Sequence, residues 1–383
     1  MTAHASVPDP AKALGARLSF ARDAAGLTQE KLSAMLGFSD RQTLSSIENG
    51  QRRIQPDELE KISQVVGKPV DWFLDPFVIA GEGAFSWRVS PSLAKEDLDA
   101  FESRTGKWIG LLRFLKSSMG TQERLLAESL EVDANMRFEE VCAMGERVGK
   151  MLDLGAIPAE RLVERIEERL DIPVLYFDGH AAAGDISGAM CKMRNFRAIL
   201  INRSEPRARR SFDAAHELFH ALTWYVLTPE HRESSEPTDD SSRLTGSKKK
   251  ALRIERLADN FAAGLLMPRS SLERVVEPAR AGDIDHLVEV AHLLQVSYAS
   301  LAFRLFNAGM IERDTCVALK AKRGIRNQDP RPKPFSMTFV KLLASGIDDG
   351  HVSARRAAGA LGMTLPQLVQ LFEQYDFHPP FDV

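Results

Sequence analysis

The stretch Ala215-His216-Glu217-Leu218-Phe219-His220-Ala221 carries two histidines four residues apart, with a glutamate between them. On a helix this spacing places both imidazoles on one face, one turn apart, where they can hold one metal ion together. Glu217 can then reach a water molecule on that metal and act as a general base. The flanking residues are good helix formers with apolar periodicity. The stretch therefore predicts a metal-binding helix; the alternative is a core helix that carries two histidines by chance.

A carboxylate that can complete the site lies on a second predicted helix, residues 253–267, which Pro268 ends. Two histidines and Glu255 leave one position of a tetrahedral zinc open for water, the arrangement that a catalytic site requires. Asp259 shares the helix face of Glu255, so it can accept the free ring N–H of a ligating histidine and fix its tautomer. For Glu255 the alternative is a solvated carboxylate on the helix surface.

Residues 210–220 and 255–268 together resemble the ImmA/IrrE family of metallopeptidases. The resemblance spans roughly residues 139–311 and implies a zinc-dependent, zincin-type peptidase; several members cleave a repressor protein to switch on genes. It implies that the metal ligands are His216, His220 and Glu255. It also implies that the catalytic base is Glu217. Where members often have Asn, this chain has Asp259, whose carboxylate can accept the same imidazole N–H.

Composition bounds the class of protein. The chain of 383 residues is long enough for two or three domains, and its net charge of −3 excludes a polycation. Its three cysteines lie far apart, which favours a reducing cytosol over a disulfide framework. There is no signal-peptide pattern and no apolar run of the ~18–20 residues that a membrane span needs. We therefore expect a cytoplasmic protein without a membrane partner.

Residues 1–76 predict a series of short helices. Thr28 can cap a helix that Gly37 ends, and residues 41–49 form the next helix after a short turn, closed by Gly50. The second of these helices has apolar residues on one side and a polar outward face. Two short helices joined in this way are how a helix-turn-helix offers a helix to the major groove of DNA.

This run resembles the DNA-binding domain of the Cro and lambda-repressor-like (XRE) family, through residues 26–29, 36–37 and 46–50. The resemblance implies that Gln29 positions a phosphate. The residues that would meet base edges or nearby backbone are Arg41, Gln42, Thr43 and Ser45. The chain is one residue longer than the usual pattern between the last two segments, which leaves open which side chains point at bases.

The charge of residues 1–76 argues for weak non-specific DNA affinity, because nine Lys and Arg face ten Asp and Glu. The alternative is a five-helix module used only for protein contact. We expect operator DNA as the partner and a homodimer as the binding unit, since one module reads too few base pairs.

Three strands are expected before the metal-binding helix in the sequence. They comprise residues 173–177, 188–193 and 198–202, and the last two form an antiparallel hairpin. Residues 77–138 are interpreted as a helical connector that begins with a linker at 81–84 and places Trp87 on an apolar helix face. This connector either forms a dimerisation surface or packs on the peptidase domain.

The predicted fold class is α+β and predominantly helical: an all-α helix-turn-helix domain followed by a zincin-like domain with a small antiparallel sheet. The expected domains are residues 1–76 (DNA binding), 77–138 (connector), 139–311 (metallopeptidase) and 312–383 (C-terminal helical region). The predicted function is a transcriptional regulator with a zinc metalloendopeptidase domain that cleaves a repressor protein or itself. The alternative is a non-proteolytic transcription factor whose zincin-like domain senses a ligand or metal.

Overall fold

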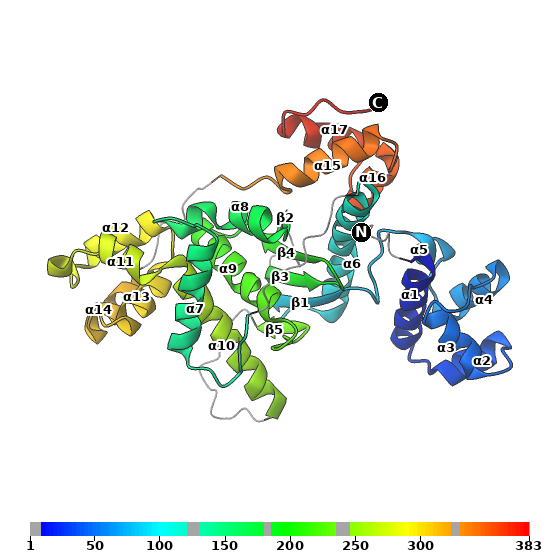
Figure 1. The fold of residues 1–383 in the computed structure, drawn as a ribbon, viewed down its shortest axis with the longest axis horizontal. Helices are drawn as coiled ribbons and strands as arrows, with labels where there is room; N and C mark the ends of the chain where they lie inside the picture. The colour runs from blue at the N-terminus through cyan, green and yellow to red at the C-terminus, as the bar shows by residue number, and fades with distance from the viewer. Residues whose placement is uncertain (1–8, 121–129, 180–184, 235–245, 323–329, 383) are drawn as a thin grey trace, which may run out of the picture.

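The computed structural model describes residues 9–120, 130–179, 185–234, 246–322 and 330–382. Within these ranges the chain forms 17 α-helices and one five-stranded sheet (Figure 1), which confirms the predominantly helical α+β class. None of the helices in the described ranges combines the length and apolar character needed to cross a bilayer. The three cysteines are free and buried, as expected.

The predicted helix-turn-helix is confirmed. Its helices are α1 (Pro10–Ala24), α2 (Gln29–Leu36), α3 (Arg41–Glu48), α4 (Pro56–Val66) and α5 (Val70–Leu74). The Thr28 hydroxyl accepts a hydrogen bond from the Lys31 backbone N–H at 3.2 Å, and Gly37 ends α2 with a φ of 74°. Leu44 and Ile47 on α3 are buried in the core of this domain, whereas Arg41 and Gln42 are exposed.

The sheet has the strand order β2-β4-β3-β1-β5. Its strands are β1 (Ala84–Val89), β2 (Val174–Phe177), β3 (Ile186–Lys192), β4 (Arg197–Asn202) and β5 (Arg232–Ser234). The predicted hairpin exists as the antiparallel pair β3–β4. The sheet as a whole is mixed, because β4 runs parallel to β2 and β5 runs parallel to β1.

Strand β1 corrects the interpretation of residues 84–89 as part of a helical connector. Phe85, Trp87 and Val89 alternate with Ser86 and Arg88, a period of two that fits a strand. The three apolar side chains pack in the core on one side of the sheet. The prediction that Trp87 lies on a helix face is wrong, because antiparallel pairing with β3 makes the segment a strand.

Two helical layers cover the sheet (Figure 1). The layer on one face contains α7 (Phe138–Met151), α8 (Pro158–Leu170), α9 (Arg207–Thr223) and α10 (Gly246–Leu266). On the other face lies α6 (Lys95–Ser118), and α15 (Met337–Asp348) and α16 (Ala354–Leu361) pack on it, with α17 (Leu365–Gln374) against α16. The remaining helices are α11 (Arg269–Val275), α12 (Ile284–Leu294), α13 (Tyr298–Asn307), α14 (Arg313–Ala321) and a 3-10 turn at Pro278–Arg280.

The segments before and after the peptidase-like region meet on the same face of the sheet. Phe101 on α6 stacks edge-on against Phe177 on β2, with ring centroids 4.9 Å apart. The Trp108 indole N–H donates to the Leu361 carbonyl of α16 at 3.2 Å. The connector was expected either to form a dimerisation surface or to pack on the peptidase domain. Helix α6 packs on the sheet, and the C-terminal helices pack with it.

Helices α7 and α10 cross closely because glycines lie at their contact. A Cβ atom on Gly264 of α10 would lie 2.0 Å from the Cys142 carbonyl oxygen, and one on Gly145 of α7 would lie 2.2 Å from the Phe261 carbonyl oxygen. Any side chain at these positions must push the two helix backbones apart. This contact sets where α10 lies against α9.

We predict that Gly264→Ala lowers the opening free energy of α7 and α10 by roughly 1–3 kcal/mol or more, because the added methyl meets backbone. Native-state hydrogen exchange of the amides in both helices measures this change. Gly359→Ala on α16 is the control, since no heavy atom lies within 4 Å of its added Cβ. That variant should be neutral or stabilised by up to about 1 kcal/mol. Equal protection in wild type and Gly264→Ala would contradict the packing argument.

Candidate metal centre

Helix α9 presents its two histidines and Glu217 to a closed space between the sheet and α10. Its opposite side, with Leu218, Phe219 and Leu222, packs in the main core, so the polar stripe faces the sheet. His216, Glu217 and His220 are all fully buried. Burial of three ionisable side chains on two turns of one helix is costly, which indicates a specific site.

The nitrogen atoms of the two histidines and the Glu255 carboxylate converge. His216 Nε2 lies 3.1 Å from His220 Nε2 and 3.2 Å from Glu255 Oε2. His220 Nε2 lies 3.6 Å from Glu255 Oε1. Ligands of a tetrahedral zinc, bound at 2.0–2.1 Å, lie about 3.3 Å from one another. The three side chains that the sequence predicted as ligands are therefore spaced as such ligands must be.

Asp259 lies where it was expected, one turn beyond Glu255 on α10. Its Oδ1 atom is 3.0 Å from His216 Nδ1. If Nδ1 donates its proton to this carboxylate, the Nε2 lone pair points into the centre, as a metal ligand requires. His220 Nδ1 is buried and has no hydrogen-bond partner among the described residues, so Asp259 orients only one of the two rings.

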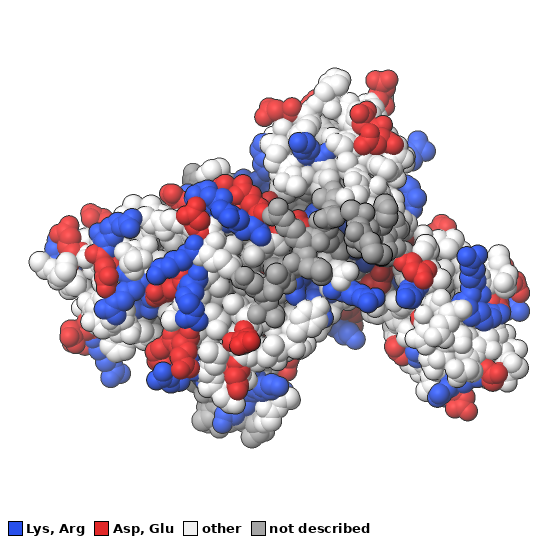
Figure 2. Space-filling model, viewed as in Figure 1, with Lys and Arg blue, Asp and Glu red and all other residues white. Residues whose placement is uncertain are grey.

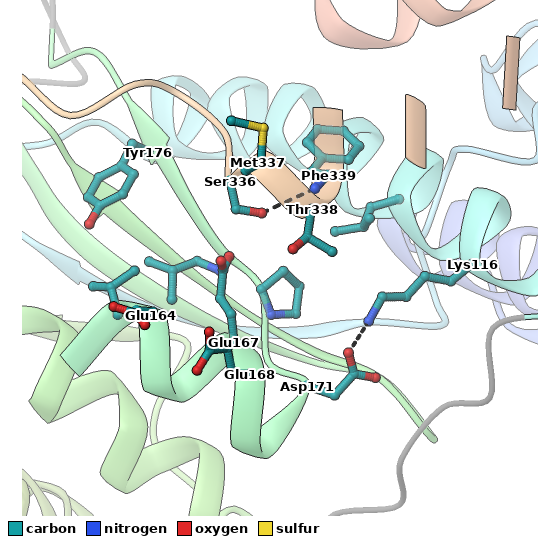
Figure 3. Close-up of a pocket in the computed structure, with 14 residues that line it drawn as sticks. Lys116, Glu164, Glu167, Glu168, Asp171, Tyr176, Ser336, Met337, Thr338 and Phe339 are labelled. Atoms are coloured by element: carbon teal, nitrogen blue, oxygen red, sulfur yellow. Dashed lines mark hydrogen bonds and ion pairs between the residues drawn. The ribbon is translucent and has the colours of Figure 1, made fainter. Parts of the chain in front are cut away.

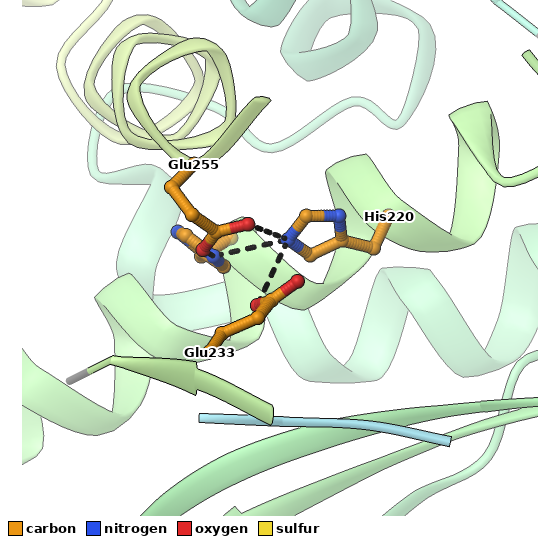
Figure 4. A group of neighbouring side chains, drawn as sticks. His220, Glu233 and Glu255 are labelled. Atoms are coloured by element: carbon orange, nitrogen blue, oxygen red, sulfur yellow. Dashed lines mark hydrogen bonds and ion pairs between the residues drawn. The ribbon is translucent and has the colours of Figure 1, made fainter. Parts of the chain in front are cut away.

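A fourth potential ligand, Glu233, comes from β5 and was not predicted (Figure 4). Its Oε2 atom lies 3.6 Å from His220 Nε2, and the side chain is almost fully buried. One ligand atom from each of the four side chains fits within 4.8 Å of the others. No local pattern indicates this ligand, because residue 233 stands in a polar, turn-rich segment.

Arg88 is the second residue that sequence reasoning missed. Its position on β1 faces α9, opposite to Trp87, and its side chain is buried. Its Nη1 lies 3.4 Å from Asp213 Oδ1, and its Nη2 lies 3.7 Å from Asp259 Oδ1. The guanidinium therefore compensates carboxylates on both metal-binding helices. The alternation of residues 84–89 is the signal that could have placed it here.

In the metal-free protein, the pKa values of the histidines and glutamates in this centre are shifted in different directions. Burial raises the pKa of Glu217 to about 8 and lowers the pKa of His220 to about 4. Burial opposes protonation of His216, yet its hydrogen bonds with Asp259 and Glu255 raise its pKa to about 9. Although burial has the opposite effect, the two histidines lower the pKa of Glu255 to about 2. Near neutral pH, the centre therefore pairs a charged His216 with an ionised Glu255.

The residues fit a divalent metal ion. They offer two imidazole nitrogens and carboxylate oxygens, a donor set that suits zinc. The carboxylate oxygens of Glu217 and Glu233 are buried without a hydrogen-bond partner among the described residues. Buried oxygens of this kind are stabilised by a nearby cation.

The predicted DNA-contact residues lie on or beside α3, with different exposure. Arg41 and Gln42 are exposed, whereas Thr43 and Ser45 are half-buried. The Gln29 side-chain amide donates to the Glu48 carboxylate at 2.7 Å, which fixes its position at the start of α2. Figure 2 shows positive and negative side chains interspersed on the visible face of this domain, in agreement with its balanced charge.

A separate cavity of about 400 Å³ lies between α8, β2 and α15 (Figure 3). Its wall includes an ion pair between Lys116 and Asp171 and the buried carboxyl of Glu167. Burial raises the pKa of Glu167 to about 7. No residue of the metal centre lines this cavity.

Comparison with known proteins identifies two segments. Residues 167–306 match the family described as the IrrE N-terminal-like domain, and residues 18–73 match a helix-turn-helix family. The apo form of the competence regulator ComR from Streptococcus vestibularis aligns with 93% of this chain and 100% of its own, at 12% identity and a TM-score of 0.16, too low to support an argument. No curated protein matches the chain. The chain thus joins a helix-turn-helix domain to a metallopeptidase-type domain, as both resemblances predicted.

We predict that zinc binds more tightly as the pH rises from about 6 to about 9, because binding must displace the proton of His216, whose pKa is about 9. Apparent affinity should rise roughly tenfold per pH unit for each proton displaced. Chelator competition at a series of pH values measures it. Asp259→Asn is the control: without this carboxylate the pKa of His216 falls, so the rise should level off at lower pH. A flat wild-type profile would contradict the assignment.

Proposed function

We propose that this chain is a cytoplasmic DNA-binding transcriptional regulator whose second domain is a zinc-dependent metalloendopeptidase. The observation that carries the proposal is the convergence of His216, His220 and Glu255 beside the unpartnered carboxylate of Glu217. The proposed substrate is a repressor protein or this chain itself, because that is what the ImmA/IrrE resemblance implies.

In the proposed mechanism, His216, His220 and Glu255 would hold a zinc ion, which would polarise the scissile carbonyl and make water more acidic. Beside such a cation the raised pKa of Glu217 would fall, because the ionised carboxylate is then favoured. In that form Glu217 takes the proton of the attacking water and passes it to the leaving amine. Gly188 on β3 lies beside that carboxylate, since a Cβ atom there would be in van der Waals contact with Glu217 Oε1 at 3.5 Å.

Asp259 and Arg88 position the reacting groups in this proposal without entering the chemistry. Asp259 holds the His216 ring in one tautomer through the 3.0 Å contact with Nδ1. Arg88 forms ion pairs with Asp213 on α9 and Asp259 on α10. This shared cation keeps α9 and α10 at a fixed separation.

The second candidate function is a transcription factor that senses a ligand or metal and cleaves nothing. The observation that favours it is the cavity between α8 and α15, because it joins the peptidase-like region to the C-terminal helices. A small molecule bound there would contact both. The fused helix-turn-helix domain also favours this candidate, because a protease that acts only on another protein needs no operator contact of its own.

We predict that Glu217→Gln retains zinc and DNA binding but loses cleavage, since the general base contributes about 10²–10⁴-fold in rate. The assay compares induction of the regulated gene and the size of each candidate substrate, beginning with a co-encoded repressor and the chain itself. Glu230→Gln removes an exposed carboxylate nearby and should behave as wild type. If wild type and Glu217→Gln do not differ in either readout, the sensor function replaces the peptidase.

DNA recognition is proposed to use α3 in the major groove, with the chain acting as a homodimer. Arg41, Gln42, Thr43 and Ser45 would contact bases or nearby backbone. Gln29 would contact a phosphate from the N-terminus of α2. The exposure of Arg41 and Gln42 on the outward face of α3 supports this assignment.

We predict that changing Gln42 and Thr43 to Ala weakens binding to the preferred sequence by about 1–3 kcal/mol while leaving non-specific binding nearly unchanged. Duplexes selected from a random pool and from the chain's own promoter supply the preferred sequence, and titration at several salt concentrations measures the affinity. The salt slope should be modest. Gln64→Ala, an exposed position on α4, is the control. Selection that enriches no sequence would refute the assignment.

A further inference from the structure

Strand β5 occupies the edge of the sheet that borders the metal centre. It pairs in parallel with β1 through three residue pairs, in which Arg88 stands opposite Glu233. The Trp87 backbone N–H also donates to the His231 carbonyl at 2.9 Å. An extended peptide can be held by adding a strand to an exposed sheet edge. Here the chain's own segment takes that place beside β1.

Two side-chain contacts hold this segment against the connector. The Arg232 guanidinium donates to the Leu93 carbonyl at 2.7 Å, and His231 Nε2 lies 2.7 Å from the Glu102 carboxylate on α6. His231 is half exposed in this pair, and each residue of the tripeptide strand has one partner on β1. The attachment of β5 to β1 is specific but covers only three residue pairs.

Glu233 points from β5 into the metal centre. Residues paired in register project to the same side of a sheet, so its side chain faces α9 together with that of Arg88. Its Oε2 atom lies 3.6 Å from His220 Nε2, close to the separation of about 3.3 Å between tetrahedral zinc ligands. Neither of its buried oxygens has a hydrogen-bond partner among the described residues.

Two histidines and two glutamates offer four candidate ligands, which is the number that a closed tetrahedral zinc site uses. A catalytic site keeps three protein ligands and one open position instead. The fourth candidate ligand, Glu233, belongs to β5, the strand at the sheet edge. Displacement of β5 would therefore free both a coordination position of the metal and the edge of β1.

We propose that β5 is an internal occupant of the substrate position and that Glu233 is a displaceable fourth ligand, so that the chain in this conformation is a latent peptidase. An extended peptide that replaces β5 beside β1 removes Glu233 from the metal and opens the fourth position. This inference rests on the proposed metallopeptidase function and names the step that precedes catalysis.

The experiment compares the full-length wild type with Glu233→Ala. Chelator competition measures zinc affinity, and calorimetric titration of the zinc-loaded protein with acetohydroxamate measures access to the fourth position. Loss of a ligand should weaken zinc binding by at least about tenfold. Opening of the position should strengthen acetohydroxamate binding by at least about tenfold, because no protein ligand has to leave first.

The control is Glu230→Ala, which removes an exposed carboxylate from the same segment and should change neither affinity. Glu233→Gln keeps the size of the side chain and should change both affinities in the same directions, so it serves if Glu233→Ala does not fold. The proposal requires both changes. Either change alone, or neither, overturns it.

Failure of this inference can be told from failure of the proposed function with His216→Ala. If that variant loses zinc while Glu233→Ala matches wild type in both titrations, the metal site stands and only the latency is wrong. If His216→Ala binds zinc as tightly as wild type, the metal site itself is wrong.

Discussion

Glu217, Glu233 and Glu255 lie beside two fully buried histidines in the interior of this protein. Removing carboxylates from water is costly unless a positive charge is near, and the unpartnered oxygens show that hydrogen bonds do not meet that cost. In the metal-free protein, burial raises the pKa of Glu217 to about 8 and also raises the pKa of Glu233, which favours the neutral form of both carboxyls. Arg88 and the charged His216 compensate the carboxylates that stay ionised. A divalent ion would stabilise the ionised form of all three glutamates.

This charge cluster explains why the elements are arranged as they are. The charged groups come from the three consecutive elements α9, β5 and α10 and from β1, which lies more than 100 residues earlier in the chain. The glycines Gly145 and Gly264 allow α10 to pack closely on α7. On the other face of the sheet, the apolar side chains of β1 pack against α6. The hydrophobic layers thus fix the geometry of a polar site that would not assemble by itself.

The DNA-binding domain is tied to the peptidase-like region by a small charged cluster. The Arg17 guanidinium of α1 donates to the carbonyls of Phe73 and Val78 at 2.7 and 2.9 Å. It also lies 3.4 Å from the Glu82 carboxylate, which the guanidinium of Arg113 on α6 contacts at 2.9 Å. Helix α6 in turn packs on the sheet. A physical connection therefore runs from the first helix of one domain to the sheet beside the metal centre.

The sequence by itself determined the features that depend on short spacings. The four-residue repeat of His216 and His220, the helix that carries Glu255, and the capped helices before Gly50 follow from local periodicity and turn chemistry. The alternation of residues 84–89 indicates which face of a strand Arg88 takes, but only the tertiary structure decided that Arg88 and Glu233 meet at the metal centre. Their strands are short, and pairing between residues 88 and 233 is set by packing across the chain, which no local pattern encodes.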